Sequence, residues 1–359
     1  MNWIRSYTII LSILLLTGTL IAQPAKKDVL IEAVKQDYKI SLFGEPVPLS
    51  NPDVRERFEK QLLLSVQDRA QVVLWLKRSG RYMPLIDAIL KRNNAPVDLK
   101  YIAIIESALR AHATSSKNAV GYWQFTAEAG RNNGLRIDSS IDERRNIFKS
   151  TEAAVRYFKD LHNMFGSWAL CAAAYNMGDD GLRTEILLQN ERDYYKLYLP
   201  QETQNYVLRI ACAKLILNDP SKFGFDPGEI EVYLPPAFDE VVINRQEETS
   251  ITSIAEASGS HFKQIKDLNP EIRGYTLTSG SHRILVPQGQ GPGFNDRLRK
   301  ILAESPKPEN MKIYVVRSGD NLSTIAAKFG VSLGALLIWN NLSTSDNIHP
   351  GDKLIVFKR

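Results

Sequence analysis

The sequence predicts a mainly α-helical domain followed by small modules that each have the order strand, helix, helix, strand. Two observations lead to this fold class. From about residue 51 to 218, apolar residues recur at intervals of three and four, which is the period of a helix with one buried face. After about residue 230, short runs of β-type composition replace this pattern, and one arrangement of runs occurs twice. With 359 residues, 44% of them apolar, the chain is long enough for more than one domain.

The first 22 residues have the features of a secretory signal peptide. Arg5 precedes a long apolar run, and small residues lie just before Gln23. We expect cleavage near Ala22, which places the mature protein in the periplasm or cell envelope. An uncleaved membrane anchor is the alternative. Because this region contains no Cys, the sequence does not predict a lipoprotein.

Six apolar-periodic runs make up the helical region. An N-terminal segment, residues 23–80, is expected to pack on a larger helical domain, residues 81–230. Clusters of turn-forming residues separate the runs. The runs are residues 52–79, 83–94, 98–109, 150–165, 167–177 and 203–217.

The rest of the chain divides into two modules and a linker. The β-type runs at 230–235, 240–245 and 282–287 fall in the first module. A Gly- and Pro-rich stretch after residue 287 is typical of a linker. The expected bounds are 231–290 for the first module, 291–311 for the linker and 312–359 for the second module.

The second module is predicted to be a βααβ unit of under fifty residues. A β-type run ends at the turn "RSGD", and Asp320 or Asn321 is placed to cap the helix that follows. A second helix covers "LGALLIWNN", and "PGDKLIVF" returns as a strand. Residues 249–287 form a weaker copy, because the "SGD" turn is missing and "SGSHRI" replaces the second turn. We interpret this copy as structural.

The composition excludes several classes of protein. Cys171 and Cys212 are the only cysteines, so a disulfide scaffold is excluded. One bridge between them and two small buried thiols both remain open. The five histidines have no ligand spacing, and we expect no metal and no cofactor. A net charge of +5, spread along the chain, does not indicate a nucleic-acid partner.

One carboxylate lies at an unusual position. Glu106 ends the apolar run "YIAIIES", so its side chain either points outward or has a function. Asp98 is placed to cap this helix, which puts Glu106 in the last turn. There the helix dipole and the apolar neighbours both disfavour the anion and raise the pKa of the carboxyl group. A raised pKa suits a general acid, because the group keeps its proton at a higher pH.

The second module resembles a LysM module, the family that binds glycans containing N-acetylglucosamine. The resemblance is carried by "YVVRSGDNLSTIAAKFGVS", "LLIWNNL" and "IHPGDKL", in that order. It implies binding to peptidoglycan strands. The glycan-binding residues that it implies are Gly319, Asp320, Asn321, Leu322, Asn340 and Ile348.

The helical region resembles the lytic transglycosylases that have a goose-lysozyme-like fold. Four motifs carry the resemblance, in this order: "ESALRAHATSSKNAVGYWQF", "GLRIDSSIDERRN", "FGSWALCAAAYNMG" and "YLPQETQNYV". The closest type is the membrane-bound lytic murein transglycosylase D, which carries C-terminal LysM modules. The resemblance implies a mainly α lysozyme-like catalytic domain, within the α+β superfamily, over about residues 51 to 230.

The resemblance also implies roles for single residues. Glu106 falls on the catalytic acid of the family. Residues that fall on the glycan groove or beside the acid are Ser115, Gly121, Gln124, Tyr175, Asn176 and Tyr206. Taken alone, Tyr175 is better explained as a core aromatic at a helix end, and a phenol beside Glu106 is the alternative.

Several positions need a separate interpretation. Asn118 stands where the family has Gly, and Asn tolerates an unusual backbone conformation better than most residues. Thr126 stands where the family has Met, which changes a groove contact. Asp142 and Glu143 are acidic but are better explained as ion-pair partners of the neighbouring arginines than as a second catalytic acid. We also expect Trp75, Trp123 and Trp168 to be core residues.

Three hypotheses about function follow. The first is a lytic transglycosylase that cleaves the bond between MurNAc and GlcNAc and leaves 1,6-anhydro ends. The second is a hydrolytic muramidase, which needs a second carboxylate or an equivalent way to hold water. The third is a peptidoglycan-binding protein without activity. The sequence does not name a protein partner.

Overall fold

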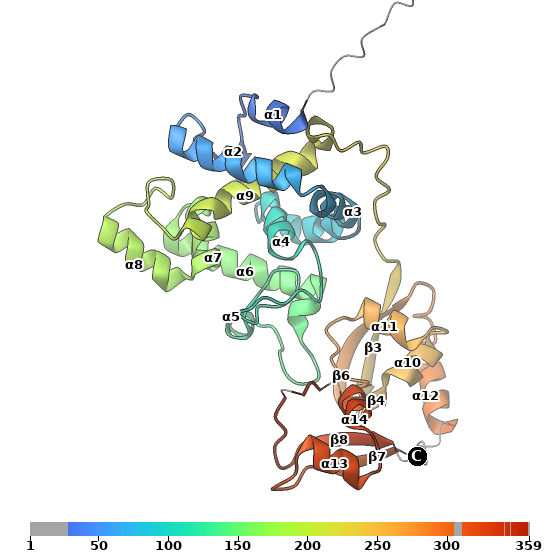
Figure 1. Cartoon of the computed structure of the whole chain (residues 1–359). Coiled ribbons are helices and arrows are strands. Elements are labelled where there is room, and N and C mark those ends of the chain that lie inside the picture. Colours follow the sequence, from blue (N-terminus) through green and yellow to red (C-terminus); the bar gives the residue numbers. More distant parts are fainter. Residues whose placement is uncertain (1–27, 305–310, 341, 345, 358–359) are drawn as a thin grey trace, which may run out of the picture.

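The computed structural model describes residues 28–304, 311–340, 342–344 and 346–357. Figure 1 shows a helical domain and, beside its lower end, two small modules. The expected signal peptide, residues 1–22, lies outside the described residues. So does the middle of the expected linker, residues 305–310.

The helical domain contains nine helices and a short hairpin within the described residues. Its largest core cluster runs from Ala33 to Phe225 and includes both the N-terminal segment and the rest of the domain. Residue 80 lies inside α3, so the boundary predicted there does not match a break in the fold. The elements are α1 (Val29–Val34), β1 (Ser41–Leu42), β2 (Glu45–Pro46), α2 (Pro52–Gln67), α3 (Arg69–Arg92), α4 (Lys100–Ser107), α5 (Ala127–Asn132), α6 (Ile147–Phe165), α7 (Trp168–Met177), α8 (Asp179–Gln189) and α9 (Gln201–Asn218).

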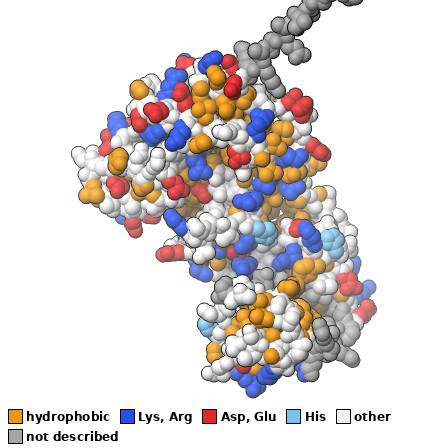
Figure 2. Space-filling view, in the orientation of Figure 1, with side chains coloured by type: hydrophobic (Ala, Val, Ile, Leu, Met, Phe, Trp, Pro, Cys, Tyr) orange, Lys and Arg blue, Asp and Glu red, His pale blue; other side chains and the backbone are white. Residues whose placement is uncertain are grey.

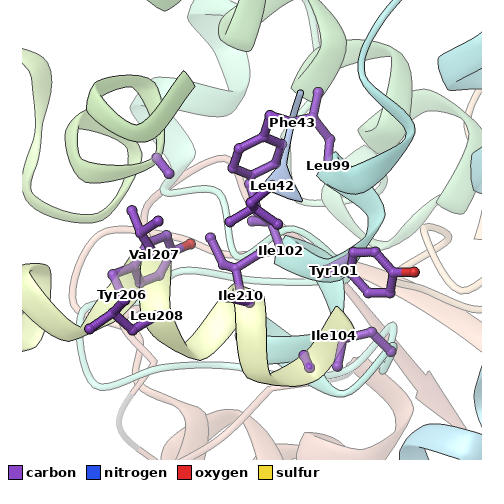
Figure 3. Close-up of a cluster of buried hydrophobic side chains, with 14 of the residues drawn as sticks. Leu42, Phe43, Leu99, Tyr101, Ile102, Ile104, Tyr206, Val207, Leu208 and Ile210 are labelled. Atoms are coloured by element: carbon purple, nitrogen blue, oxygen red, sulfur yellow. The ribbon is translucent and has the colours of Figure 1, made fainter. Parts of the chain in front are cut away.

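The centre of this domain is made of helices that are buried on most sides. Six successive residues of α7, from Ala169 to Ala174, are buried, and their small side chains let neighbouring helices approach closely. Helix α4 packs against α9, and Figure 3 shows Ile102 of α4 beside Ile210 of α9. Cys171 and Cys212 are both buried free thiols, which answers the question that the sequence left open.

Two sequence expectations about this domain are wrong. The run 52–79 breaks at Asp68, whose side chain accepts from the Gln71 amide and caps a new helix. That helix then continues through Pro84, because apolar residues on both sides of the proline are buried in the core. The run 230–235 forms no strand. It crosses α3 at Gly80, where the Tyr233 amide donates to the Lys77 carbonyl oxygen at 2.8 Å.

The first module is a βααβ unit with an added helix. Strand β3 (Phe238–Arg245) pairs antiparallel with β6 (Gly280–Pro287) over its whole length. Between them lie β4 (Thr249–Ser250), α10 (Ile251–Ala257), α11 (Phe262–Leu268) and β5 (Thr276–Leu277). Helix α12 (Phe294–Glu304) follows, and its residues Phe294 and Leu298 are buried in the module core. The linker predicted over 291–311 is therefore wrong for these residues, because the apolar face of α12 completes the core.

The second module repeats the plan. Strands β7 (Met311–Val315) and β8 (Lys353–Phe357) pair antiparallel around α13 (Leu322–Lys328) and α14 (Leu333–Asn340). Asn321 caps α13 by accepting from the Thr324 amide at 2.9 Å, as predicted. Asn269 of the first module and Asn340 of the second each exchange hydrogen bonds with the backbone of the last strand. The repeat seen in the sequence is thus a repeat of structure.

Backbone contacts join the first module to the helical domain. Ile141 pairs with Ile272 in an isolated β-bridge, and its side chain is buried in the module core. The Asp142 amide donates to the Glu271 carbonyl oxygen, and the Arg273 amide donates to that of Ser140, both at 2.8 Å. These bonds hold the two domains in one arrangement.

Among the described residues, no single helix is both long and apolar enough to cross a membrane. One bent pair, α13 with α14, passes the same test on length and composition. Both helices bury apolar residues in the core of the second module.

Candidate active site

Glu106 lies in the last turn of α4, as the sequence predicted. The helix ends directly after it because Ala108 and Leu109 adopt left-handed conformations, with φ of 50° and 57°. Asp98 does not cap α4. It lies in a short 3₁₀ turn, where its carboxylate accepts from the Phe43 amide and from Lys214 Nζ, both at 2.8 Å.

Tyr206 of α9 is the hydrogen-bond partner of the acid. Its hydroxyl group donates to Glu106 Oε1 at 2.5 Å, across 100 residues of sequence. The ring is buried, with 2% of the residue exposed, so the hydroxyl group has a fixed position. This bond orients the carboxyl group at the end of α4.

The surroundings of Glu106 favour its protonated form. Burial raises the pKa of this carboxyl group above its ordinary value, and it is the largest influence. The Tyr206 hydrogen bond and the positive charge of Arg209 act in the opposite direction, and the negative charge of Glu202 adds to the rise. The pKa remains raised, so the group keeps a transferable proton at a higher pH than a free glutamic acid does.

Tyr175 does not form a hydrogen bond with the acid, although its phenol was considered for that role. Its hydroxyl group donates to the Trp123 carbonyl oxygen and not to Glu106. Its ring stacks on Phe158 with ring centroids 4.8 Å apart. The negative charge of Glu106 still contributes to raising the pKa of Tyr175, so the two groups are near each other. Tyr175 therefore supports the backbone of the loop beside the acid.

The loop after α4 is held by its own hydrogen bonds. Ser107 Oγ donates to the Tyr122 carbonyl oxygen at 2.7 Å, and Gln124 Nε2 donates to those of Ala113 and Gly121. Ser115 Oγ accepts from the Lys117 and Ala119 amides, so it shapes the turn.

Asn118 adopts the unusual backbone conformation that was considered for it, since its φ of 57° lies in the left-handed region. A short Asn side chain tolerates this conformation because it crowds the backbone little. The substitution relative to the family pattern is therefore compatible with the turn.

Position 121 requires a glycine. Its φ is 85°, and a Cβ atom there would lie 1.9 Å from the Arg144 carbonyl oxygen. Arg144 is fixed in turn by a bidentate pair with the buried Asp142, at 2.8 and 2.9 Å. The interpretation of Asp142 as an ion-pair partner of the neighbouring arginines is confirmed, whereas for Glu143 that partner is wrong, because its carboxylate pairs with Lys149.

Asn176 and the three tryptophans lie in packed parts of the helical domain. Asn176 Oδ1 accepts from the Thr203 hydroxyl group at 2.8 Å, which connects the end of α7 to α9. Trp123 is fully buried, and its indole N–H donates to Thr151 Oγ1 at 3.0 Å. Trp75 is buried and Trp168 is half-buried, stacked on His162.

Sequence reasoning missed two charged neighbours of the acid. Glu202 and Arg209 both act on the pKa of Glu106, and both belong to α9. Their signal was present, since positions 202, 206 and 209 fall on one face of a helix. This spacing alone does not connect the two charged residues with Glu106, because only the structure shows that Tyr206 faces Glu106.

The second module has a groove of about 360 Å³. Four of the six expected glycan-binding residues line it, namely Asp320, Asn321, Leu322 and Ile348. Gly319 forms the preceding turn with φ of 87°. Asn340 is not in the groove, because its amide group is bound to the β8 backbone.

The part of the chain that the structure describes contains no cluster of three or more His, Cys, Asp or Glu side chains able to hold a metal ion.

Three family models match the chain in the order of its domains. The transglycosylase SLT domain matches residues 83–198, the LysM-like domain of lytic transglycosylase MltD matches 237–303, and the LysM domain matches 314–357. The second of these includes most of α12, in agreement with the fold. These matches confirm the lysozyme-like and LysM interpretations.

Comparison with single proteins gives the same result. The chain is 32% identical over 333 residues to the membrane-bound lytic murein transglycosylase D of Escherichia coli (strain K12), covering 88% of this chain and 72% of that protein. It is 29% identical over 158 residues to a putative tributyltin chloride resistance protein of Alteromonas sp. (strain M-1), covering 42% and 76%.

A solved structure of an inactive mutant of the lytic transglycosylase Slt from Pseudomonas aeruginosa aligns with a TM-score of 0.31 and 19% identity, over 42% of this chain and 26% of that one. A TM-score this low supports no conclusion about the fold of this chain. The match to the E. coli protein covers nearly the whole chain and spans the helical domain and both modules. The chain therefore belongs to the family of the membrane-bound lytic murein transglycosylase D.

Proposed function

We propose that this lytic murein transglycosylase uses Glu106 as its only proton-transferring side chain and releases products with 1,6-anhydro ends. The observation that carries the proposal is the buried carboxyl group of Glu106, which has a raised pKa and is oriented by Tyr206. Such a group can donate a proton at a higher pH than a free glutamic acid does, and it can accept one afterwards.

The reaction has two proton transfers. Glu106 protonates the oxygen between MurNAc and GlcNAc, and the bond from that oxygen to MurNAc C1 breaks. The N-acetyl oxygen of MurNAc stabilises the positive charge that develops at C1. The Glu106 carboxylate then takes the proton of the MurNAc C6 hydroxyl group while that oxygen bonds to C1. The acid is restored and no water is consumed.

The products separate this proposal from its two alternatives. Digestion of purified sacculi followed by mass spectrometry should give fragments with anhydro ends. A hydrolytic muramidase would give reducing ends, which are heavier by one water, and a protein that only binds would release nothing. Reducing ends as the main product would reject the single-acid mechanism.

We further propose that the enzyme acts in the cell envelope after secretion through residues 1–22. Support comes from the apolar N-terminal run and from the peptidoglycan substrate. The second module would hold the enzyme on glycan strands through the groove lined by Asp320, Asn321, Leu322 and Ile348.

The pH profile tests the environment of the acid. Because cleavage needs protonated Glu106, activity should fall at high pH, and this limb should lie above the value of about 4.3 for a free glutamic acid. Changing Tyr206 to Phe removes a donor that stabilises the ionised form, so the limb should move to higher pH. Initial rates across the pH range, with protein shown to be folded, give the answer. Tyr198→Phe, at a residue 83% exposed, should leave the limb in place.

Deleting the second module tests its role as an anchor. Removal of residues 312–359 should lower retention on insoluble peptidoglycan by about 10²-fold, because a tethered binding site raises the local concentration of strands. Cleavage of short soluble glycans should change less than about twofold, since the deletion leaves α4 and α9 intact. Pull-down and rate measurements on the same samples check both. Equal retention of the two proteins would contradict the anchor role.

A further inference from the structure

A pocket of about 360 Å³ lies between the helical domain and the first module. Its size falls within the range of about 300–1,000 Å³ that small-ligand sites have. His112 and Arg145 come from the helical domain, while Lys266 and Arg273 come from the module. We call it the junction pocket. Neither domain forms it alone, so it exists only while the module is docked.

The junction pocket has an excess of positive charge. Arg145, Lys266 and Arg273 line it, and the only acidic residue in its wall is Asp267, which is already paired with Lys263 at 2.5 Å. Behind the wall, the single carboxylate of Asp142 is shared by Arg144, Arg145 and Arg273. One carboxylate cannot neutralise three guanidinium groups, so an anion entering the pocket would find uncompensated cations.

The side chains of Arg273 and Lys266 also have hydrogen-bond donors that are not used within the part of the protein that the structure describes. Apart from its long ion pair to Asp142 at 3.7 Å, the Arg273 side chain has no hydrogen-bond acceptor within the described residues, and it is 39% exposed. Lys266 Nζ uses two of its three donors on the carbonyl oxygens of Ile272 and Gly274. Burial and the charge of Arg273 lower the pKa of Lys266 to about 8, and a bound anion would relieve this repulsion.

One wall of the junction pocket is aromatic. The rings of Phe262 and Tyr275 lie 5.4 Å apart with 30° between their planes. The Tyr275 hydroxyl group donates to the Ile338 carbonyl oxygen of the second module at 3.0 Å, which fixes the ring. The pocket therefore combines cations with an apolar surface, which suits a ligand that has carboxylates on a short aliphatic chain.

The junction pocket is connected to the active-site loop. His112 belongs to the loop that follows Glu106, and Arg145 Nη1 lies 3.2 Å from His112 Nδ1. The same arginine is adjacent to Arg144, whose carbonyl oxygen packs against Gly121. Figure 2 shows Lys and Arg side chains gathered on the visible face around this junction. The junction pocket is thus connected to Glu106 through the loop that follows α4.

We propose that the junction pocket binds a carboxylate of a peptide stem attached to the glycan strand. The inference rests on the proposed peptidoglycan substrate, whose stems carry free carboxylates. The pocket would then let the enzyme distinguish peptide-bearing strands from bare ones.

The test compares the affinities of two substrates. Binding of the Glu106→Gln protein is measured to peptide-bearing strands and to strands stripped of peptides by an amidase. Adding Lys266→Gln or Arg273→Gln should lower affinity for peptide-bearing strands by about tenfold, the loss expected for one charge-assisted hydrogen bond. Affinity for bare strands should stay the same. Two separate variants are used because Lys266 also ties the module backbone, whereas Arg273 is half-exposed.

The matched control is Lys300→Gln, which removes one exposed positive charge from α12 of the same module and should change neither affinity. Equal losses on both kinds of strand, or no loss on either, would overturn the proposal. Free stem peptide should compete for the pocket, and inorganic phosphate competing equally well would also overturn it. If the Glu106→Gln protein still cleaves strands, the proposed mechanism fails while the binding comparison remains valid.

Discussion

Replacing Glu106 with Gln is expected to lower glycan cleavage by at least about 10²–10⁴-fold, the range that general acid catalysis contributes. The change keeps the size of the side chain and an oxygen that can accept from the Tyr206 hydroxyl group. It removes only the transferable proton. Release of soluble fragments from sacculi measures the loss, and thermal unfolding should show a folded protein that still binds peptidoglycan.

Two other substitutions make this result specific. Glu229→Gln removes a carboxylate from an exposed turn and should leave the rate unchanged. Glu202→Gln removes the other acid that acts on Glu106 and should change the rate only a few-fold if one acid performs both transfers. A loss at Glu202 as large as that at Glu106 would favour a two-carboxylate hydrolase. A Glu106→Gln enzyme that keeps a sizeable share of the parent rate would show that the acid is another residue.

Gly121→Ala is expected to have the largest effect on stability. The new methyl group would lie 1.9 Å from the Arg144 carbonyl oxygen, and the residue would keep a φ of 85° that side chains disfavour. Overpacking and backbone strain each cost about 1–3 kcal/mol, so the free energy of unfolding should fall by roughly 2–5 kcal/mol. Cleavage should fall as well, because the loop carrying Gln124 must move. Thermal unfolding and initial rates give both quantities.

Two glycines separate the causes of that effect. Gly166 has a φ of 75° with open space around it, so Gly166→Ala should show the strain without the clash. Gly181 lies within α8, where an added methyl group makes ordinary contact with Met177, and Gly181→Ala should be neutral or stabilising by about 0.5–1 kcal/mol. If Gly121→Ala behaved like Gly166→Ala, the backbone of Arg144 would be free to move and the loop less rigid than described.

Several features followed from short stretches of sequence. Glu106 was placed at the end of a buried helix by the apolar pattern of α4, and the structure puts it there. The capping role of Asn321 and the two βααβ units were also predicted, because a cap and a helical period depend on residues a few positions apart. The left-handed turn at Asn118 belongs to the same group.

Other features depended on residues far apart in the chain. The resemblance implied both Tyr175 and Tyr206 as site residues, and only the structure shows that the hydrogen bond to Glu106 comes from Tyr206, 100 residues away. Asp98 had every local feature of a cap, yet it binds Phe43 and Lys214 instead. Residues 291–311 were assigned to a linker, although part of this range forms α12. The apolar face of α12 could be recognised only once it was seen to pack against the module core.

There is a physical reason why some of these features follow from the sequence and others only from the tertiary structure. The sequence by itself determined the main helical runs of the helical domain and the position of Glu106 in the last turn of α4, since these depend on local backbone preferences and on the period of apolar residues. Only the tertiary structure decided which phenol holds the acid, which charges set its pKa and where Arg145 meets Lys266 and Arg273. Those pairings form when packing brings distant segments together, and hydrogen bonds and charges then act over a few ångströms of space, whatever their separation along the chain.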